Sequence, residues 1–210
     1  AVGNTANGIV PTDATAGYPL LATAAATLYL NRIQARSAVA CWLDVYDCLF
    51  SAGAYVFNAN VTLTAQPSYT GRVPGSDFNG LELWLEAVTA FTGSQSIAIT
   101  YLDQDGVSSA TGTIATGVAP IVGRMFQMPL AAGDSGIQRV NIVTSTVSTA
   151  GTFNVHVMRW LWGCRINGVN QGVVDSLLST GLPQIFDTSA LRVVVIADST
   201  ATSLPSIRAE

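Results

Sequence analysis

Residues 152–162 read TFNVHVMRWLW, and this stretch decides the fold class. Its side chains fall into two alternating sets, which are Phe153, Val155, Val157 and Leu161 on one side and Asn154, His156, Met158, Trp160 and Trp162 on the other. Alternation with a period of two is typical of a β-strand that places one face on a core. We therefore expect a strand over Thr152–Trp162.

Similar segments occur along most of the chain, separated by turn signals such as Asp103–Gly106 and Ala131–Gly136. The further expected strands are Thr27–Ile33, Ser37–Phe50, Tyr55–Leu63, Leu81–Phe91, Ser96–Asp103, Gly112–Thr116, Gly123–Leu130, Gln138–Val147 and Leu191–Ala197. Short connections favour antiparallel neighbours. The sequence thus predicts an all-β fold, an antiparallel β-sandwich of jelly-roll-like type.

Three regions follow from the composition along the chain. Residues 1–19 are rich in Gly, Asn, Thr and Ala and predict an extended N-terminal arm. Residues 20–165 hold the sandwich, with a long loop at 66–80 whose prolines and glycines interrupt strand pairing. Residues 166–210 predict an irregular C-terminal segment with one or two helical turns at Val173–Leu178, the strand 191–197 and a polar tail from 198.

Composition restricts the function classes. The 210 residues fit one domain or two small ones, and the formal net charge is −4. All nine cations are arginines scattered from Arg32 to Arg208, which argues against nucleic acid as a direct partner. The longest apolar stretch, Leu20–Leu30, is too short to span a bilayer. The first residues lack the pattern of a secretory signal, so we expect a cytosolic start.

Three cysteines, Cys41, Cys48 and Cys164, form an odd set without metal-ligand spacing. Cys41 and Cys48 are seven residues apart, so a continuous strand would point them to opposite faces. Buried, reduced thiols are one interpretation, and crosslinks between subunits are the other.

The motifs that suggest catalysis are weak, and we expect no catalytic residue, no cofactor and no bound metal. The Gly133–Gly136 turn (GDSG) is similar to a serine-protease nucleophile loop, but the single histidine, His156, follows the serine instead of preceding it. A packed, hydrogen-bonded neutral imidazole is the better interpretation of His156. A hydrolase built on Asp134, Ser135 and His156 stays as a minor alternative. Glu82 and Glu86 lie about 13 Å apart along a strand, too far for an acid–base pair.

Four phrases together resemble virion structural proteins of tailed bacteriophages, over roughly residues 20–165. They are Cys41–Gly53 (CWLDVYDCLFSAG), Leu83–Glu86 (LWLE), Ile99–Gly106 (ITYLDQDG) and Gly123–Ile137 (GRMFQMPLAAGDSGI). The resemblance implies a capsid decoration or cement protein without enzymatic activity, located in the virion after assembly in the bacterial cytoplasm. It implies the major capsid protein or other virion proteins as partners, and a homo-oligomer such as a trimer. Members often carry a basic residue where this chain has Cys48.

Aromatic residues and arginine are enriched in interface cores. The candidate interface residues are Trp42, Trp84, Trp160, Trp162 and Arg124. A monomeric core filled by the four tryptophans is the competing interpretation. A second hypothesis is a tail or fibre component that binds glycans or a receptor, with Tyr69, Phe78 and Trp84 stacking on sugar rings.

Overall fold

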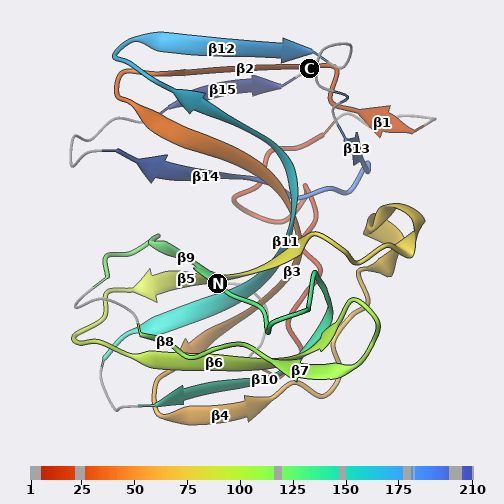
Figure 1. Ribbon diagram of the computed structural model, residues 1–210, viewed down its shortest axis with the longest axis vertical. Coiled ribbons are helices and arrows are strands. Elements are labelled where there is room, and N and C mark those ends of the chain that lie inside the picture. Colours follow the sequence, from red (N-terminus) through yellow and green to blue (C-terminus); the bar gives the residue numbers. More distant parts are fainter. Residues whose placement is uncertain are drawn as a thin grey trace. The chain divides into compact units, whose positions relative to one another are not determined.

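The computed structural model describes residues 6–21, 27–115, 120–146, 150–176, 181, 183–198 and 205–209. Its elements (Figure 1) are β1 Leu28–Tyr29, β2 Arg32–Ser37, β3 Cys41–Val56, β4 Ala59–Thr62, β5 Leu81–Thr89, β6 Ser96–Asp103, β7 Ser108–Ala110, β8 Ile114–Ala115, β9 Met125–Met128, β10 Ile137–Thr146, β11 Thr152–Ile166, β12 Gln171–Ser176, β13 Gln184–Ile185, β14 Leu191–Ala197 and β15 Ser206–Ala209. Two 3-10 turns, η1 Thr70–Arg72 and η2 Pro74–Ser76, lie in the predicted 66–80 loop. No α-helix occurs among the described residues.

The chain divides into two compact units that interleave in sequence. Unit 1 contains residues 1–11 and 48–159, and unit 2 contains residues 12–47 and 160–210. The chain crosses from one unit to the other inside β3, between Asp47 and Cys48, and inside β11, between Arg159 and Trp160. The units therefore do not follow the expected boundaries at residues 20 and 165, because the two longest strands each contribute to both units.

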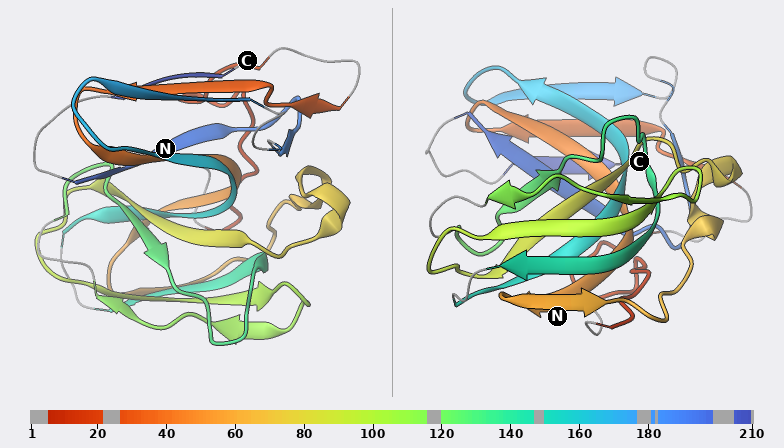
Figure 2. Two further views of the ribbon diagram at one scale, coloured as in Figure 1. Left: turned by 45° about the horizontal axis from the view of Figure 1, so that its top comes forward. Right: turned by 60° about the horizontal axis from the view of Figure 1, so that its bottom comes forward.

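Unit 1 is a two-layered sandwich. One layer contains parts of β3 and β11 with β5 and β9, and the other has the order β4-β10-β6-β7, with β8 also paired to β6. In Figure 2 (right) the second layer lies in front, with β4 in orange, β10 in teal and β6 in yellow-green. Alternate side chains of both layers fill one core, which includes Tyr55, Leu83, Leu85, Ile97, Ile99, Tyr101, Val140, Val143, Phe153, Val155 and Val157.

Unit 2 has a smaller core between two further layers. The strands β12, β2 and β15 form one layer, and β14 pairs with the unit-2 part of β3 in the other. Their shared core includes Ile33, Ala35, Cys41, Leu43, Val45, Leu161, Trp162 and Ile166. Ile185 of the short pair β1–β13 and Leu30, the residue after β1, also belong to this core. The pairs of strands whose register is defined are antiparallel throughout, so the predicted antiparallel all-β, sandwich-like fold is confirmed.

Strand β3 runs further than the sequence pattern predicts. The expected strand ends at Phe50, yet β3 continues through Ser51-Ala52-Gly53 to Val56. Gly53 has φ +152°, and a Cβ there would overlap the side chain of Asn154 on β11. The glycine is therefore needed for close approach of two strands instead of a turn.

The N-terminal segment is not a free arm in its described part. Ile9 exchanges backbone hydrogen bonds with Ser51 at 2.8 and 2.9 Å, and Val10 packs against the core of unit 1. The buried Arg72 guanidinium donates to the carbonyls of Pro11 and Cys48. Residues 9–11 therefore pack against their own chain, because their backbone groups bond to strand β3 and to the side chain of Arg72.

The C-terminal region is also more regular than expected. Residues 171–176 form β12 paired with β2, where helical turns at Val173–Leu178 were predicted; residues 177 and 178 lie outside the described residues. The predicted polar tail contains β15, which pairs with the other edge of β2. These strands lack strong periodicity, and their pairing with β2 decides their conformation.

Candidate functional site

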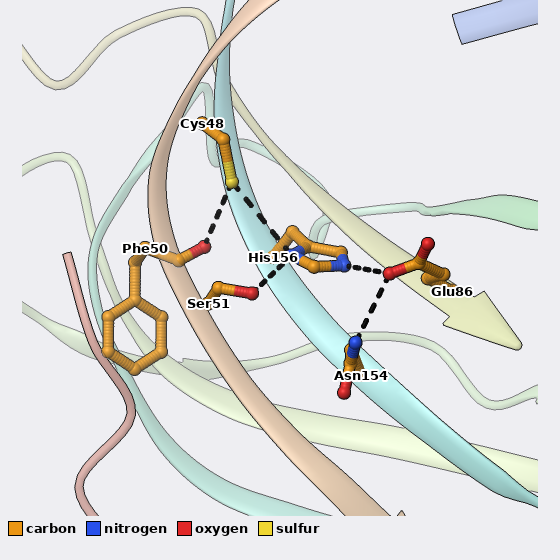
Figure 3. A network of polar contacts seen from close by, with 6 residues as sticks. All are labelled: Cys48, Phe50, Ser51, Glu86, Asn154 and His156. Carbon is orange, nitrogen blue, oxygen red and sulfur yellow. Dashed lines mark hydrogen bonds and ion pairs between the residues drawn. The ribbon is translucent and has the colours of Figure 1, made fainter. Parts of the chain in front are cut away.

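The polar cluster most like a catalytic site lies in unit 1, on β3, β5 and β11 (Figure 3). Glu86 on β5 is the direct cross-strand partner of Asn154 on β11, and His156 follows two residues later on the same face. Val155 and Val157 alternate with these residues and point into the core, so His156 projects from the opposite face. Strand β3 contributes Ser51.

Each ring nitrogen of His156 has a partner. Nδ1 lies 2.6 Å from Ser51 Oγ, and Nε2 lies 3.0 Å from Glu86 Oε2. The same Glu86 oxygen accepts a hydrogen bond of 3.1 Å from Asn154 Nδ2. Cys48 Sγ lies 3.9 Å from Nδ1 and donates to the carbonyl of Phe50 at 3.6 Å. The dashed lines in Figure 3 trace this chain of contacts.

One arrangement of protons satisfies the cluster with a neutral imidazole. Nε2–H donates to the Glu86 carboxylate, and Nδ1 accepts from the Ser51 hydroxyl. His156 is thus a buried, hydrogen-bonded side chain, as expected from the sequence, and its contacts are compatible with the expected neutral ring. The links to Ser51 and Glu86, 105 and 70 residues away, carry no local sequence signal.

The order serine, histidine, carboxylate is that of a nucleophilic triad, but the exposure is inverted. Ser51 and His156 have no exposed surface, whereas the Glu86 side chain is 20% exposed. The backbone N–H and carbonyl of Ser51 are both used by Ile9. A substrate carbonyl would therefore meet the carboxylate end and not the hydroxyl, so the cluster joins three strands and does not present a nucleophile.

The Asp134–Ser135 motif has different partners. Asp134 Oδ2 accepts a hydrogen bond of 2.6 Å from Tyr101 Oη, and Ser135 Oγ donates to Asn79. Hydrogen bonds from Ser109 and Tyr101 hold the pKa of Asp134 below its usual value. Since both nitrogens of His156 are already occupied by Ser51 and Glu86, the structure does not assemble the alternative hydrolase site.

Residues 131–134 form the expected turn, closed by a 3.1 Å bond from the Asp134 amide to Ala131. Gly136 pairs with Asn79, and a Cβ at Gly136 would overlap the Phe78 carbonyl oxygen. Position 136 therefore needs a glycine because the backbone of Phe78 lies too close for a side chain. A groove of about 470 Å³ runs along this turn and the start of β5, and Asp134 and Ser135 form part of its wall.

The aromatic candidates separate into buried and exposed residues. Trp84 and Trp162 are 6% and 3% exposed, and their indoles donate to Glu82 and Asp175. Tyr69 is also buried and donates to the Ile137 carbonyl. Contrary to expectation, the rings of Trp84 and Tyr69 are therefore not sugar-stacking platforms, and Trp84 and Trp162 offer little surface to a partner.

Trp42 and Trp160 are the exposed tryptophans, at 42% and 48%. Arg124 is exposed as well and lies over the ring of Phe126 in unit 1, 5.7 Å from its centroid. Phe78, the remaining sugar-stacking candidate, is half-buried and packs edge-on against Tyr69.

The exposed tryptophans belong to one surface of unit 2, here called the outer face, defined by Trp42, Asp44, Trp160, Arg165 and Ile196. Trp42 on β3 is the cross-strand partner of Ile196 on β14, which is 50% exposed. The Trp160 indole donates to Asp44 Oδ1 at 3.0 Å, which fixes the ring on the same side of β3 as Trp42. The Arg165 guanidinium lies 5.5 Å from the Trp42 ring centroid.

The three cysteines are free and buried. Desolvation, with smaller effects from Asp175 and Cys41, raises the pKa of Cys164 to about 11. Burial and a raised pKa both lower the reactivity of the Cys164 thiol in the folded chain. In the described part of the chain, no group of three or more His, Cys, Asp or Glu residues is arranged to hold a metal ion.

No family model, no curated protein and no solved structure matches this chain. Within the described residues, no helix has the length and apolar character needed to cross a membrane.

Proposed function

We propose that this chain is a non-enzymatic structural protein of a virion, a decoration or cement protein that adds contacts between the subunits of a phage shell. The observation that carries the proposal is the outer face, where exposed tryptophan and isoleucine side chains lie on the neighbouring strands β3, β11 and β14. The four phrases that resemble phage virion proteins supply the biological setting.

The outer face has the composition of an interface core. Trp42 and Trp160 offer large, rigid rings, and Arg165 lies over one of them. The ion pair between Arg165 and Asp198, at 2.8 Å, forms a polar margin beside these rings. Burying such rings against another protein removes apolar surface from water and so stabilises the assembled particle.

A structural role also agrees with the burial and hydrogen bonding of the side chains that could act as nucleophile or base. Ser51 and His156 are enclosed, and Ser135 is bonded to Asn79 and has no histidine beside it. The contribution of the protein to a shell is then buried contact area, which raises the barrier to rupture under the pressure of packaged DNA.

The test is heat-induced rupture of shells with and without bound protein, followed by DNA release. Wild-type chain should bind and raise the rupture temperature, and the double variant Trp42→Ala/Trp160→Ala should bind at least tenfold more weakly, since each ring is a major contact. Val107→Ala, a change at a 61% exposed turn residue of unit 1, is the control and should bind like wild type. Equal binding by wild type and the double variant would reject the proposal.

A second candidate function rests on one specific feature of unit 2. A groove of about 340 Å³ beside Trp160 is lined also by Trp162, Asp175 and Pro183. An exposed indole next to a carboxylate is suited to stacking and hydrogen bonding with a sugar ring. Glycan-array binding that is lost in Trp160→Ala would favour this function, and an array without signal would remove it.

A further inference from the structure

The strand β14 forms an edge of its sheet, and its side chains are unusually apolar for an edge. The sheet order is β14-β3-β11-β5-β9, and no other described strand pairs with the far side of β14. Val193, Val195 and Ile196 are 43%, 42% and 50% exposed, so both faces of the strand present apolar surface. Natural edge strands are usually protected by charge, proline or a bulge, because an open edge pairs with other chains.

The hydrogen-bonding pattern shows which residues of β14 face the open edge. The amide of Asp198 donates to the Ala40 carbonyl, and these two residues continue the register that pairs Ala197 with Cys41. In an antiparallel ladder, alternate residues bond to the same neighbour. The even-numbered residues of β14 therefore bond to β3, and Val193, Val195 and Ala197 direct their N–H and carbonyl groups outward.

The charges of β14 fit a second copy in one register. In an antiparallel pair of β14 strands centred on Val195, Val195 faces Val195 of the other copy. A residue a given number of positions before Val195 then faces the residue the same number of positions after it. Arg192 of one copy then lies opposite Asp198 of the other, twice in the dimer, and Val194 lies opposite Ile196. Centred on Val194, the pairing would set Arg192 against Ile196 and Asp198 against Ala190, so no opposite charges would face each other across the axis. Centred on Val195, the Asp198 carboxylate, which already pairs with Arg165 of its own chain at 2.8 Å, also faces Arg192 of the second copy. Charge complementarity thus selects Val195 as the centre.

We infer that β14 is the contact strand of a two-fold dimer, in which it pairs antiparallel with β14 of a second copy and Val195 faces Val195. The outward N–H and carbonyl groups of Val193, Val195 and Ala197 then bond across the axis. The outer faces of the two copies become one continuous surface with Trp42 twice on it. This inference rests on the proposed structural function and names one partner, a second copy, as a dimer instead of the trimer expected from the resemblance.

Cysteine crosslinking tests the register. Val195→Cys places a thiol opposite its own copy and should form a disulfide dimer under mild oxidation. Val193→Cys is the matched control: it has the same exposure, lies on the same face and neighbours the same edge. Its two copies are offset by four residues, about 13 Å along the strand, so it should stay uncrosslinked. The native cysteines are buried and do not compete. Equal crosslinking of both variants, or none of either, overturns the inferred register.

Light scattering of the purified full chain tests the dimer itself. Wild type should have the mass of a dimer, and Val195→Lys, which places two ammonium groups face to face, should have the mass of a monomer with an unchanged circular dichroism spectrum. Val174→Lys adds the same charge to the edge strand β12, at a 58% exposed position, and should stay dimeric. A monomeric or trimeric wild type, or a dimeric Val195→Lys, overturns the inference. Because no shells are present, this result is independent of the shell-binding test.

Discussion

His156 Nε2 lies 3.0 Å from Glu86 Oε2 although 70 residues separate the two in the sequence. The imidazole has no exposed surface, and it connects β11 to β5 through Glu86 and to β3 through Ser51. We expect His156→Ala to lower the free energy of unfolding by about 3 kcal/mol, because it leaves a hydroxyl and a carboxylate without this partner. Urea denaturation followed by circular dichroism measures the loss.

Ser51→Ala is the matched variant for the other side of the ring. It removes one neutral hydrogen bond and keeps the histidine–carboxylate pair, so the expected loss is about 1 kcal/mol. Labelling by a fluorophosphonate should not occur at Ser51 in the folded chain, since its hydroxyl is enclosed. Rapid labelling of Ser51 would show that the cluster opens to substrate and would contradict the structural role.

Gly136 stands where the backbone of the GDSG turn contacts the segment before β5. We expect Gly136→Ala to destabilise the fold by about 2 kcal/mol, a cost within the range for a backbone that must shift to relieve overlap. A Cβ there would overlap the Phe78 carbonyl oxygen, whereas a Cβ at Gly112 would meet nothing within 4 Å. Gly112→Ala is therefore the control and should melt like wild type. Equal melting temperatures for the two variants would contradict this packing argument.

The sequence predicts the strands of unit 1 well because their alternation is strong. Ser96–Asp103 matches β6 residue for residue, and Leu81–Phe91 contains β5. The extension of β3 through Gly53 could not be predicted, since glycine usually interrupts a strand and here allows contact with Asn154. Strands β12 and β15 were missed because their order comes from pairing with β2.

The candidate site was harder to predict than the fold. The single histidine was correctly expected to be a hydrogen-bonded side chain, but Ser51 lies just beyond the expected strand Ser37–Phe50, and Glu86 was considered only with Glu82. Contacts between residues separated by 70 and 105 positions depend on strand order, which periodicity does not encode. Exposure of Trp42 and Trp160 but not of Trp84 and Trp162 likewise follows from the tertiary packing.

Asp47 is a buried carboxylate in unit 2 with a clear structural role. Its Oδ2 accepts from the Ser189 hydroxyl at 2.7 Å, and its Oδ1 accepts from the Ala190 amide at 3.0 Å. We expect Asp47→Ala to cost about 3 kcal/mol, because two buried donors lose a charged acceptor. Asp105→Ala, at an exposed turn carboxylate bonded to Gln104, should cost less than about 1 kcal/mol. Similar losses in thermal melts of the two variants would contradict the assigned role of Asp47.

Cys164 gives the protein a predictable response to alkaline pH. Desolvation raises its pKa to about 11 from the usual 9.0, so the folded chain holds this proton more tightly than the unfolded chain does. The contribution of Cys164 to stability is therefore complete below pH 9 and is lost as pH rises from 9 through about 11. At pH 8, two pKa units correspond to about a hundredfold smaller thiolate fraction, and alkylation of native Cys164 should be slower by at least that factor than in urea.

Cys164→Ala is the comparison for stability: buried Tyr55, Tyr69 and Tyr101 also have raised pKa values, and these tyrosines remain in both proteins. The difference in the free energy of unfolding between wild type and Cys164→Ala should thus change between pH 9 and pH 11, in the direction of relative loss for wild type. A constant difference across that range, or fast alkylation of the folded chain at pH 8, would show that the Cys164 thiol is solvated.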